Sequence, residues 1–480
     1  MAGQICALGT YCHGNRVGYT RTRGLQSCPT RSCLITMEMG VYALLSLLFL
    51  ASGLAAELSG NESVHLLDWS ADLASSLSQL YDSNRDCDFH ITVAGKDNAS
   101  QPMDLCAHSL ILSLNSEAAF LLGHGENTST VLVDEECLTY VDPFIRYLYT
   151  RSIEIKLSSV KCFHKIASDY KATKLQQFCA QLFSLIIPED PTFHAQLDLY
   201  NYALDSQDPQ LAELCLQFLA WNCEAFSETE AWLNLSYEQL RALLVRSDVV
   251  VRDELSLLRA LGRWRTLNRL DRHLVEEIRF PMIPPEDLFQ LQFNLSFYSD
   301  FEALFQGRIL ESLEFHTVSF QTLAQHVNLT EATFTPRIYT SPGWTHQMNS
   351  NDNSYYYGMY QSFQTPTHPS FIFRSQLLYW NAGFHPSSQS CRNYGFTCPE
   401  GSFPLLSLAS AYSAEHSIWY ENKALMRCQG NVITEVQDFK DRLAIVPSGA
   451  NGSPFPCPSG YSQFTLVIRP MYVALPDPIV

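Results

Sequence analysis

The chain has 480 residues, of which 46% are hydrophobic and 17% charged, a balance that excludes intrinsic disorder and predicts about three domains at this length. A formal net charge of -18 excludes sequence-independent nucleic-acid binding, which draws its energy from clustered Lys and Arg. The sequence has no P-loop, dinucleotide fingerprint, zinc-protease HExxH motif or nucleophile elbow, so we expect neither an enzyme nor a cofactor.

An apolar run at residues 41–50 is followed by small side chains up to Ala56. About ten apolar residues are too few for a membrane-spanning helix, which needs about 20, but they suit a signal peptide. Two methionines stand just before the run. We therefore interpret residues 37–56 as a signal peptide and residues 1–36 as an extension outside the functional protein. The alternative is an uncleaved signal anchor with a basic cytoplasmic tail.

Cysteine usage also bears on the compartment. Four of the 15 cysteines lie in residues 1–36, which leaves 11 after the signal peptide. In an oxidising compartment most should pair, and the odd number leaves at least one free or bridging two chains. The sequence leaves the connectivity open. The disulfide candidates are Cys87, Cys106, Cys137, Cys162, Cys179, Cys215, Cys391, Cys398, Cys428 and Cys457, and Cys223 is the eleventh cysteine.

Acceptor motifs for N-glycosylation, Asn-x-Ser/Thr, are a second and independent indication of export. One such motif arises easily by chance, but seven behind a signal peptide predict a secreted chain with glycans on surface loops. The acceptors are Asn61, Asn98, Asn127, Asn234, Asn294, Asn328 and Asn451. The last is weakened by Pro454, which follows its Ser453.

The first predicted element is an amphipathic helix. Leu66, Trp69, Leu73, Leu77 and Leu80 recur at helical spacing and form one apolar stripe that faces a partner. Alternating apolar residues then predict a strand at 89–93, and further strands are expected at 131–133 and 153–157. Helices are expected at 107–122, 137–149 and 160–172.

Three stretches in this region, DCDFHITV, LCAHSLILSLNSEAAF and FIRYLYTRSIEI, resemble the BTB/POZ domain in both order and spacing. The resemblance implies an α/β interaction module over residues 57–185. It also implies dimerisation through the helix before the first strand, which is the Leu66 to Leu80 stripe. His108 matches a position that lies inside this fold rather than at a reactive site.

From residue 191 the apolar periodicity is purely helical. Leu211, Leu214, Cys215, Phe218 and Leu219 follow the spacing of one buried helix face. Capping boxes predict helix starts at Ser227, with Glu230, and at Ser236, with Gln239. The strings LDLYNYALDSQDPQLAELCLQFLAWNCEAF and EEIRFPMIPPEDL resemble the BACK helical domain, which implies such a domain over residues 186–295.

Residues 310–480 change character. Aromatic and β-branched runs at 370–380, 431–439 and 464–473 alternate with turn residues and predict a β-rich, sandwich-like domain. The fold class expected for the whole chain is therefore multidomain α+β.

Three local motifs admit a functional alternative. Cys391-x6-Cys398 is expected to form a small disulfide loop rather than a metal site. Cys162 and His164 offer only two of the four ligands that a structural metal site needs, so no metal is predicted. The run Tyr355, Tyr356, Tyr357 could bind sugars or proteins directly, although edge-strand packing is the commoner cause of such runs.

Strings such as PRIYTSP, YENKALM and VIRPMY, with those above, resemble the galectin-3-binding protein family from about residue 57 to the end. The resemblance implies galectins as partners through N-glycans, integrins, collagens and fibronectin as further partners, and roles in cell adhesion and host defence. It also implies a homo-oligomer in the extracellular matrix. This family carries a scavenger-receptor cysteine-rich domain before the BTB domain, and the roughly thirty residues between Ala56 and Cys87 are too few for one.

The competing function is an intracellular BTB and BACK substrate adaptor for a cullin ubiquitin ligase, which the same two domains would suggest if the signal peptide were not used. The acceptor motifs and the cysteine-rich C-terminal region oppose it.

Overall fold

The computed structural model describes residues 70–97, 100–122, 127–350, 359–399, 401, 403–410, 418–428, 432–448 and 452–472. The predicted signal peptide 37–56, the extension 1–36, Leu66, Trp69 and the tyrosine run 355–357 lie outside these residues. The elements from Asp72 onward belong to one compact unit. No helix within the described ranges is both long enough and apolar enough to cross a membrane.

The N-terminal segment is a small sheet with helices on it. Strand β1 lies between the other two, and pairs antiparallel with β2 and parallel with β3. Its side chains alternate between buried and accessible, as predicted from the sequence. The elements are α2 (Ser70–Ser83), β1 (Phe89–Gly95), β2 (Met103–Ala107), α3 (Ser109–Ser113), η1 (Ser116–Ala118), β3 (Thr128–Val133), η2 (Glu135–Tyr140), α4 (Val141–Thr150), η3 (Leu157–Ser159), α5 (Val160–Asp169) and α6 (Thr173–Ile186).

Two predictions in this segment are wrong. The helix expected at 107–122 is broken, because the Asn115 carboxamide caps η1 through the Glu117 N–H and also donates to the Leu148 carbonyl. The strand expected at 153–157 does not form. Ile153 and Ile155 alternate because one side of an extended segment packs on the core, and not because it joins a sheet.

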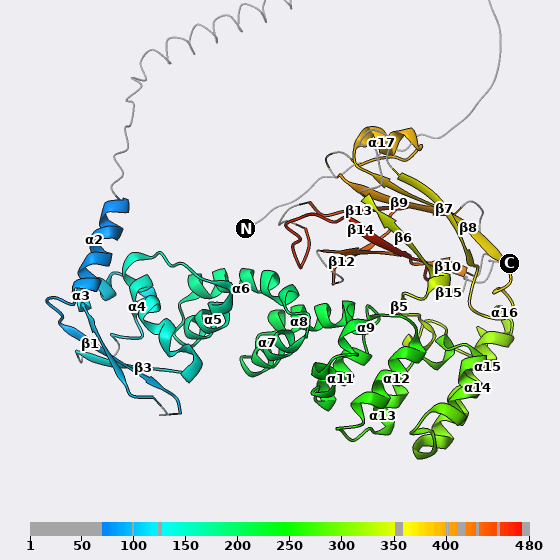
Figure 1. Cartoon of the computed structure of the whole chain (residues 1–480), viewed down its shortest axis with the longest axis horizontal. Helices are drawn as coiled ribbons and strands as arrows, with labels where there is room; N and C mark the ends of the chain where they lie inside the picture. Colours follow the sequence, from blue (N-terminus) through cyan, green and yellow to red (C-terminus); the bar gives the residue numbers. More distant parts are fainter. Residues whose placement is uncertain are drawn as a thin grey trace, which may run out of the picture. The chain divides into compact units, whose positions relative to one another are not determined.

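The middle of the chain is a succession of helices (Figure 1). They are η4 (Ile187–Glu189), α7 (His194–Asp205), α8 (Pro209–Trp221), α9 (Cys223–Phe226), α10 (Glu230–Leu233), α11 (Tyr237–Leu244), α12 (Glu254–Trp264), α13 (Arg272–Glu276), η5 (Phe280–Met282), α14 (Pro285–Asn294), η6 (Tyr298–Phe301), α15 (Glu302–Thr317), α16 (Phe320–Leu323) and η7 (Ala332–Phe334). Helices thus extend past residue 310, where the sequence predicted a β-rich region.

The two predicted capping boxes have different outcomes. Ser236 and Gln239 form the complete box at the start of α11, with side chain and backbone paired in both directions. Ser227 instead ends α9, where its hydroxyl donates to the Glu224 carbonyl, and α10 begins after Thr229. The capping box predicted at Ser227 is wrong, because the end of α9 uses the Ser227 hydroxyl.

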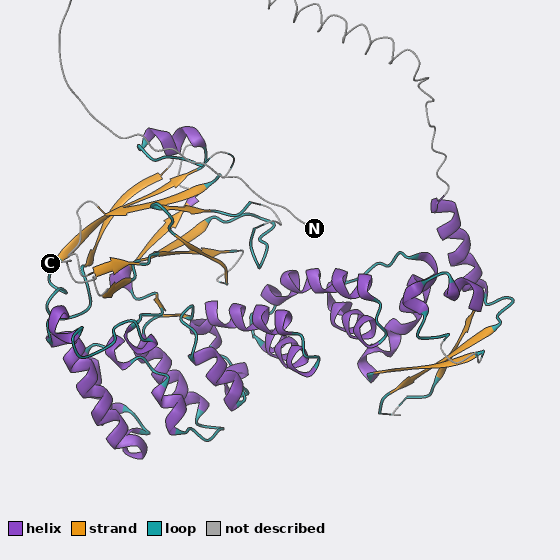
Figure 2. Cartoon of the chain, turned by 180° about the vertical axis from the view of Figure 1, so that it is seen from behind, coloured by secondary structure: helices purple, strands orange, loops and turns teal. Residues whose placement is uncertain are grey.

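The C-terminal segment is a β-sandwich (Figure 2). One sheet has the order β12-β11-β14-β6 and the other β13-β9-β8-β7. Phe384 and Phe464 meet between them with ring centroids 5.4 Å apart. The strands are β6 (Thr345–Asn349), β7 (Met359–Pro366), β8 (Leu377–His385), β9 (Leu405–Ser410), β10 (Ile418–Tyr420), β11 (Lys423–Arg427), β12 (Ile433–Asp438), β13 (Leu443–Ile445), β14 (Gln463–Val467) and β15 (Pro470–Tyr472), with η8 (Pro342–Trp344) before β6 and α17 (Ser388–Asn393) after β8. The predicted multidomain α+β class is confirmed.

Candidate functional site

The described acceptor asparagines are all exposed. Asn127 precedes β3, Asn234 follows α10, Asn294 is the last residue of α14, and Asn328 lies between α16 and η7. Asn61, Asn98 and Asn451 lie outside the described residues. Each of the four asparagines therefore offers its amide to solvent, as a glycan would require.

Asn328 has the best defined local geometry of the four. Its Oδ1 accepts from the Thr330 backbone N–H at 3.2 Å and from the Thr330 hydroxyl at 2.7 Å. This turn holds the acceptor and the hydroxyl of its own motif together. Both bonds use Oδ1, whereas a glycan would be carried on Nδ2. The turn is therefore compatible with a modified side chain.

The structure pairs eight of the disulfide candidates. The bonds are Cys87–Cys106, Cys137–Cys162, Cys391–Cys398 and Cys428–Cys457. The predicted small loop at Cys391 is thus a disulfide. The other two candidates, Cys179 and Cys215, are unpaired, so the prediction that they form disulfides is wrong.

Burial explains why those two thiols stay reduced. Cys179 in α6 and Cys215 in α8 both have 0% exposure, as does Cys223, which was not a candidate. Burial raises the pKa of each thiol to about 12, so the reactive thiolate is scarce at neutral pH. All three pack as small apolar side chains in the core.

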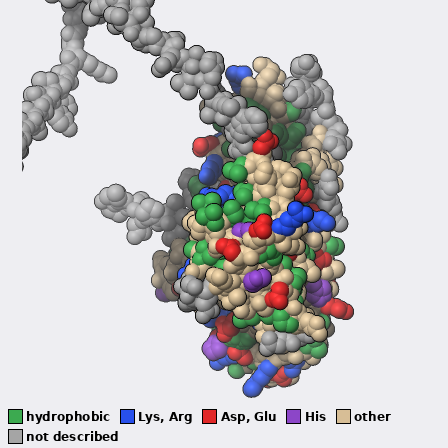
Figure 3. Space-filling model, turned by 90° about the vertical axis from the view of Figure 1, so that its left-hand side faces the viewer, with side chains coloured by type: hydrophobic (Ala, Val, Ile, Leu, Met, Phe, Trp, Pro, Cys, Tyr) green, Lys and Arg blue, Asp and Glu red, His purple; other side chains and the backbone are tan. Residues whose placement is uncertain are grey.

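The predicted dimer helix is partly described. Within α2, Leu73 is 62% exposed and Leu77 and Leu80 are half-buried. The helix is attached to the segment by Tyr81, whose hydroxyl donates to Asp142 at 2.7 Å. In Figure 3, which faces this end of the chain, apolar side chains lie among scattered acidic and basic ones. An exposed Leu on an anchored helix is available to a partner.

A junction joins the helical segment to the sandwich, and the sequence did not predict it. The Asn222 carboxamide, at the end of α8, donates to the Ile433 carbonyl at 2.9 Å and accepts from the Ile433 N–H at 2.7 Å. One side chain thus continues the hydrogen bonding of β12, which lies at the edge of its sheet. Both groups are buried, so each bond has little competition from water.

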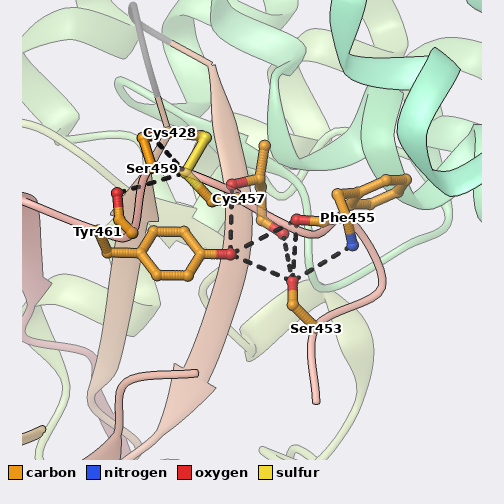
Figure 4. Close-up of a disulfide and its surroundings, with 8 residues drawn as sticks. Cys428, Ser453, Phe455, Cys457, Ser459 and Tyr461 are labelled. Carbon is orange, nitrogen blue, oxygen red and sulfur yellow. Dashed lines mark hydrogen bonds between the residues drawn. A yellow bond between two sulfur atoms is a disulfide. The ribbon is translucent and has the colours of Figure 1, made fainter. Parts of the chain in front are cut away.

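The loop at 452–461 supplies the apolar part of this junction (Figure 4). Phe455 is fully buried and contacts Phe218 and Trp221 of α8 edge-on, with centroids 5.1 and 5.8 Å apart. The Cys428–Cys457 disulfide ties the loop to the end of β11. The Ser453 hydroxyl accepts from the Phe455 N–H at 3.2 Å and from the Tyr461 hydroxyl at 3.2 Å, which fixes the loop further.

A buried ion pair forms the centre of a second contact between the two segments. Arg337 donates to Glu254 at 3.1 Å, and both side chains have 0% exposure. The Tyr339 hydroxyl and the Arg279 N–H also donate to Glu254, at 2.7 and 2.9 Å. Burial acts to raise the pKa of Glu254, but the Arg337 charge and these donors outweigh it, and the net pKa is lowered.

The residues around this pair come from both segments. Strand β5 (Ile338–Tyr339) pairs with β4 (Val250–Val251) on the helical side. From the sandwich side, Arg469 donates to the Pro336 carbonyl at 2.9 Å. The segment around Arg337 connects the helices to the sandwich. The Glu254 carboxylate holds this connecting segment against the helices, and Arg469 holds it against the sandwich.

Two histidines that could suggest catalysis have structural hydrogen bonds. His108 is buried and bonds the Tyr149 hydroxyl at 3.0 Å, as the inward position predicted for it requires. His385 and Ser407 are hydrogen-bonded at 2.8 Å, but both have 0% exposure, and burial lowers the pKa of His385 to about 4. Such a pair has neither substrate access nor a base poised near neutral pH.

One group of side chains in the described ranges lies close enough together to suggest a metal site. Glu136, Cys137 and Cys162 place their ligand atoms within 4.8 Å of one another. However, the two sulfur atoms form a disulfide and are not available as thiolates.

The helical segment is similar to a known domain family. The family model described as BACK, BTB And C-terminal Kelch, matches residues 196–292, within the run of helices. A BTB/POZ domain-containing protein 17 from Xenopus laevis is 30% identical over 352 residues, 72% of this chain and 74% of the relative. Its name refers to a domain and not to an enzymatic activity.

Greater similarity is found with two proteins of one name. Galectin-3-binding protein from Bos taurus is 48% identical over 425 residues, 85% of this chain and 76% of the relative. The protein of that name from Pongo abelii is 44% identical over 453 residues, 86% of this chain and 77% of the relative. Both are named for binding. The chain belongs to the galectin-3-binding protein family.

Proposed function

We propose that this protein is a secreted, non-enzymatic glycoprotein that forms oligomers and displays N-glycans to galectins. The observation that carries the proposal is the exposure of all four described acceptor asparagines on a frame held by disulfides. Disulfides of this number are expected in an oxidising compartment. A signal peptide at residues 37–56 would direct the chain there and would then be removed.

The name of the bovine and orangutan relatives supports galectin-3 as the partner. Single glycan contacts are weak, but several copies on one particle raise the overall avidity by about 10²- to 10⁴-fold. The proposed biological role is cell adhesion and host defence, with integrins, collagens and fibronectin as further partners. These partners are expected from the family and have no assigned surface on this chain.

The glycan claim can be tested at one motif with a matched pair of variants. In Asn127-Thr128-Ser129, Ser129→Ala removes the acceptor hydroxyl, whereas Thr128→Ala changes only the middle position. We expect Ser129→Ala alone to lose one glycosidase-sensitive step in electrophoretic mobility of protein from culture medium. Equal mobility of the two variants would contradict glycosylation at Asn127.

Galectin binding is then measured on a variant with Asn→Gln at all seven acceptors, residues 61, 98, 127, 234, 294, 328 and 451. We expect at least tenfold weaker capture of galectin-3, because a multivalent ligand loses several contacts together. Unchanged capture by enzymatically deglycosylated protein would favour a protein surface as the binding site. Absence of the wild-type protein from the medium would favour the intracellular adaptor instead.

Oligomer formation is proposed to start from α2. Replacing Leu73 with Glu is expected to convert dimers to monomers in light scattering, because a charge would be buried at the apolar contact. Leu267→Glu is the matched control, since Leu267 is 68% exposed and lies in the helical segment. Equal masses for the two variants would contradict a dimer through this helix.

A further inference from the structure

A cavity of about 200 Å³ lies where the helical segment meets the sandwich. Its walls are mainly apolar, and include Leu255, Met282, Phe315, Phe334, Trp344 and Ile468. Ligand sites occur preferentially at domain interfaces, which is where this cavity lies. An apolar cavity of roughly 150 Å³ already holds a benzene ring. This cavity therefore has room for one substituted ring.

The two guanidinium groups at the cavity are already engaged by the protein. Arg337 is ion-paired with Glu254 and donates to the Glu277 carbonyl at 2.9 Å. Arg469 donates to the Pro336 carbonyl and is ion-paired with Glu421. Neither arginine needs a ligand to satisfy it, so an anionic ligand is not indicated by these charges.

The acidic groups at the cavity argue further against an anion. Asp253 and Asp287 both line it. Burial, followed by the charge of Asp253, raises the pKa of Asp287. A free carboxylate entering beside them would be repelled.

At the cavity, His368 has one ring nitrogen, Nε2, whose hydrogen bonding the protein leaves open. It lines the cavity, is 2% exposed, and its Nδ1 accepts from the Ser370 N–H at 3.2 Å. Burial, and then the charge of His316, hold its pKa well below the usual 6.5, so the ring is neutral and its proton is on Nε2. No acceptor for this N–H is found among the described residues. A ligand oxygen in the cavity would give this N–H an acceptor.

We propose that this cavity binds a small, uncharged, mainly aromatic molecule whose single oxygen acceptor takes the hydrogen bond from Nε2 of His368. Leu255, Phe315 and Ile468 supply the apolar contact, and the acidic side chains exclude carboxylates. The site goes beyond the proposed glycan display and does not depend on it.

The proposal is tested with three probes of one shape: acetophenone, α-methylstyrene and benzoate. α-Methylstyrene replaces the ketone oxygen with a CH₂ group, and benzoate adds a charge. With the full secreted protein, we expect acetophenone to bind roughly three- to tenfold more tightly than α-methylstyrene in ligand-observed NMR titrations. Benzoate should show no saturable binding. Equal affinity for the two neutral probes, or tighter binding of benzoate, would overturn the proposal.

Variants separate the cavity from any other apolar surface. Leu255→Trp should fill the space and abolish binding of both neutral probes. His368→Phe should still bind both neutral probes, but with equal affinity. His368→Gln keeps a donor, so it should bind acetophenone more tightly than α-methylstyrene, by a smaller factor than wild type. A thermal melt close to wild type establishes that each variant is folded. If His368→Phe is unfolded, the other two variants still test the proposal. Binding of both neutral probes that is unchanged in Leu255→Trp would show that they bind outside this cavity.

Discussion

Replacing Arg337 with Met is expected to lower the free energy of unfolding by about 3 to 5 kcal/mol, because Glu254 would remain buried without its counter-charge. The guanidinium also donates to the Glu277 carbonyl, which would lose this partner inside the protein. Urea unfolding followed by tryptophan fluorescence measures the loss, since Trp232 and Trp264 are buried in the helical segment. The loss is therefore expected to exceed that from breaking a surface ion pair.

The matched control is Arg272→Met. Arg272 forms an i,i+4 pair with Glu276 and its side chain is 67% exposed, so we expect a change within about 0.5 kcal/mol. The double change Glu254→Gln with Arg337→Met should recover part of the loss, because it removes the isolated charge. A loss below about 1 kcal/mol for Arg337→Met alone would contradict the role of this pair.

Replacing Phe455 with Ala is expected to lower the free energy of unfolding by about 3 to 5 kcal/mol, the range for a buried Phe truncated in a core that cannot collapse. The ring is fully buried against α8, and the Cys428–Cys457 disulfide restrains its loop. Loss of the ring would leave a new space between α8 and the sandwich. We therefore also expect faster proteolysis of the connecting segment around Pro336. Urea unfolding and timed proteolysis measure the two effects.

Phe293→Ala is the control for this prediction, since Phe293 is 68% exposed on α14. A change within about 0.5 kcal/mol is expected there. If Phe455→Ala were no more destabilising than Phe293→Ala, the loop would not be part of the junction.

Local patterns predicted the elements whose stabilisation is local. The alternation at 89–93, the helix face at Leu211 to Leu219 and the Ser236 capping box are each decided by residues within one or two turns. The sequence failed at Ser227 and at residues 153–157, where a helix end or packing against a distant core competes with the local preference. The same limit explains the helices found beyond residue 310.

The junction could not be predicted, because its residues are far apart in sequence. The strings IRFPM, PRIYTSP and VIRPMY were informative as family features, and each supplies one arginine: Arg279, Arg337 and Arg469. Nothing in the strings themselves indicates that these arginines meet around one connecting segment. The closeness of these arginines disfavours the charged form of Arg279, since burial and then the charge of Arg337 lower its pKa to about 10. Sequence periodicity reports burial of a face but not which distant polar groups share it.

Disulfide connectivity was also open from the sequence, because spacing alone does not exclude the buried thiols. Cys179 and Cys215 lie on helix faces that point into the core, and that burial is decided by the packing of α6 and α8. The four described acceptor asparagines lie on loops or at helix ends, where a motif for surface modification is expected.

The four disulfides span sequence separations of 19, 25, 7 and 29 residues. Each one therefore closes within a stretch that emerges from the ribosome in a few seconds, at about 5 to 20 residues per second. Oxidation can follow the order of synthesis, because both cysteines of each N-terminal pair are made before the sandwich. The helical segment between them contributes only thiols that folding removes from solvent. In the secreted protein that we propose, the order of synthesis therefore favours pairing within each segment, before any competing cysteine of the later segment is available.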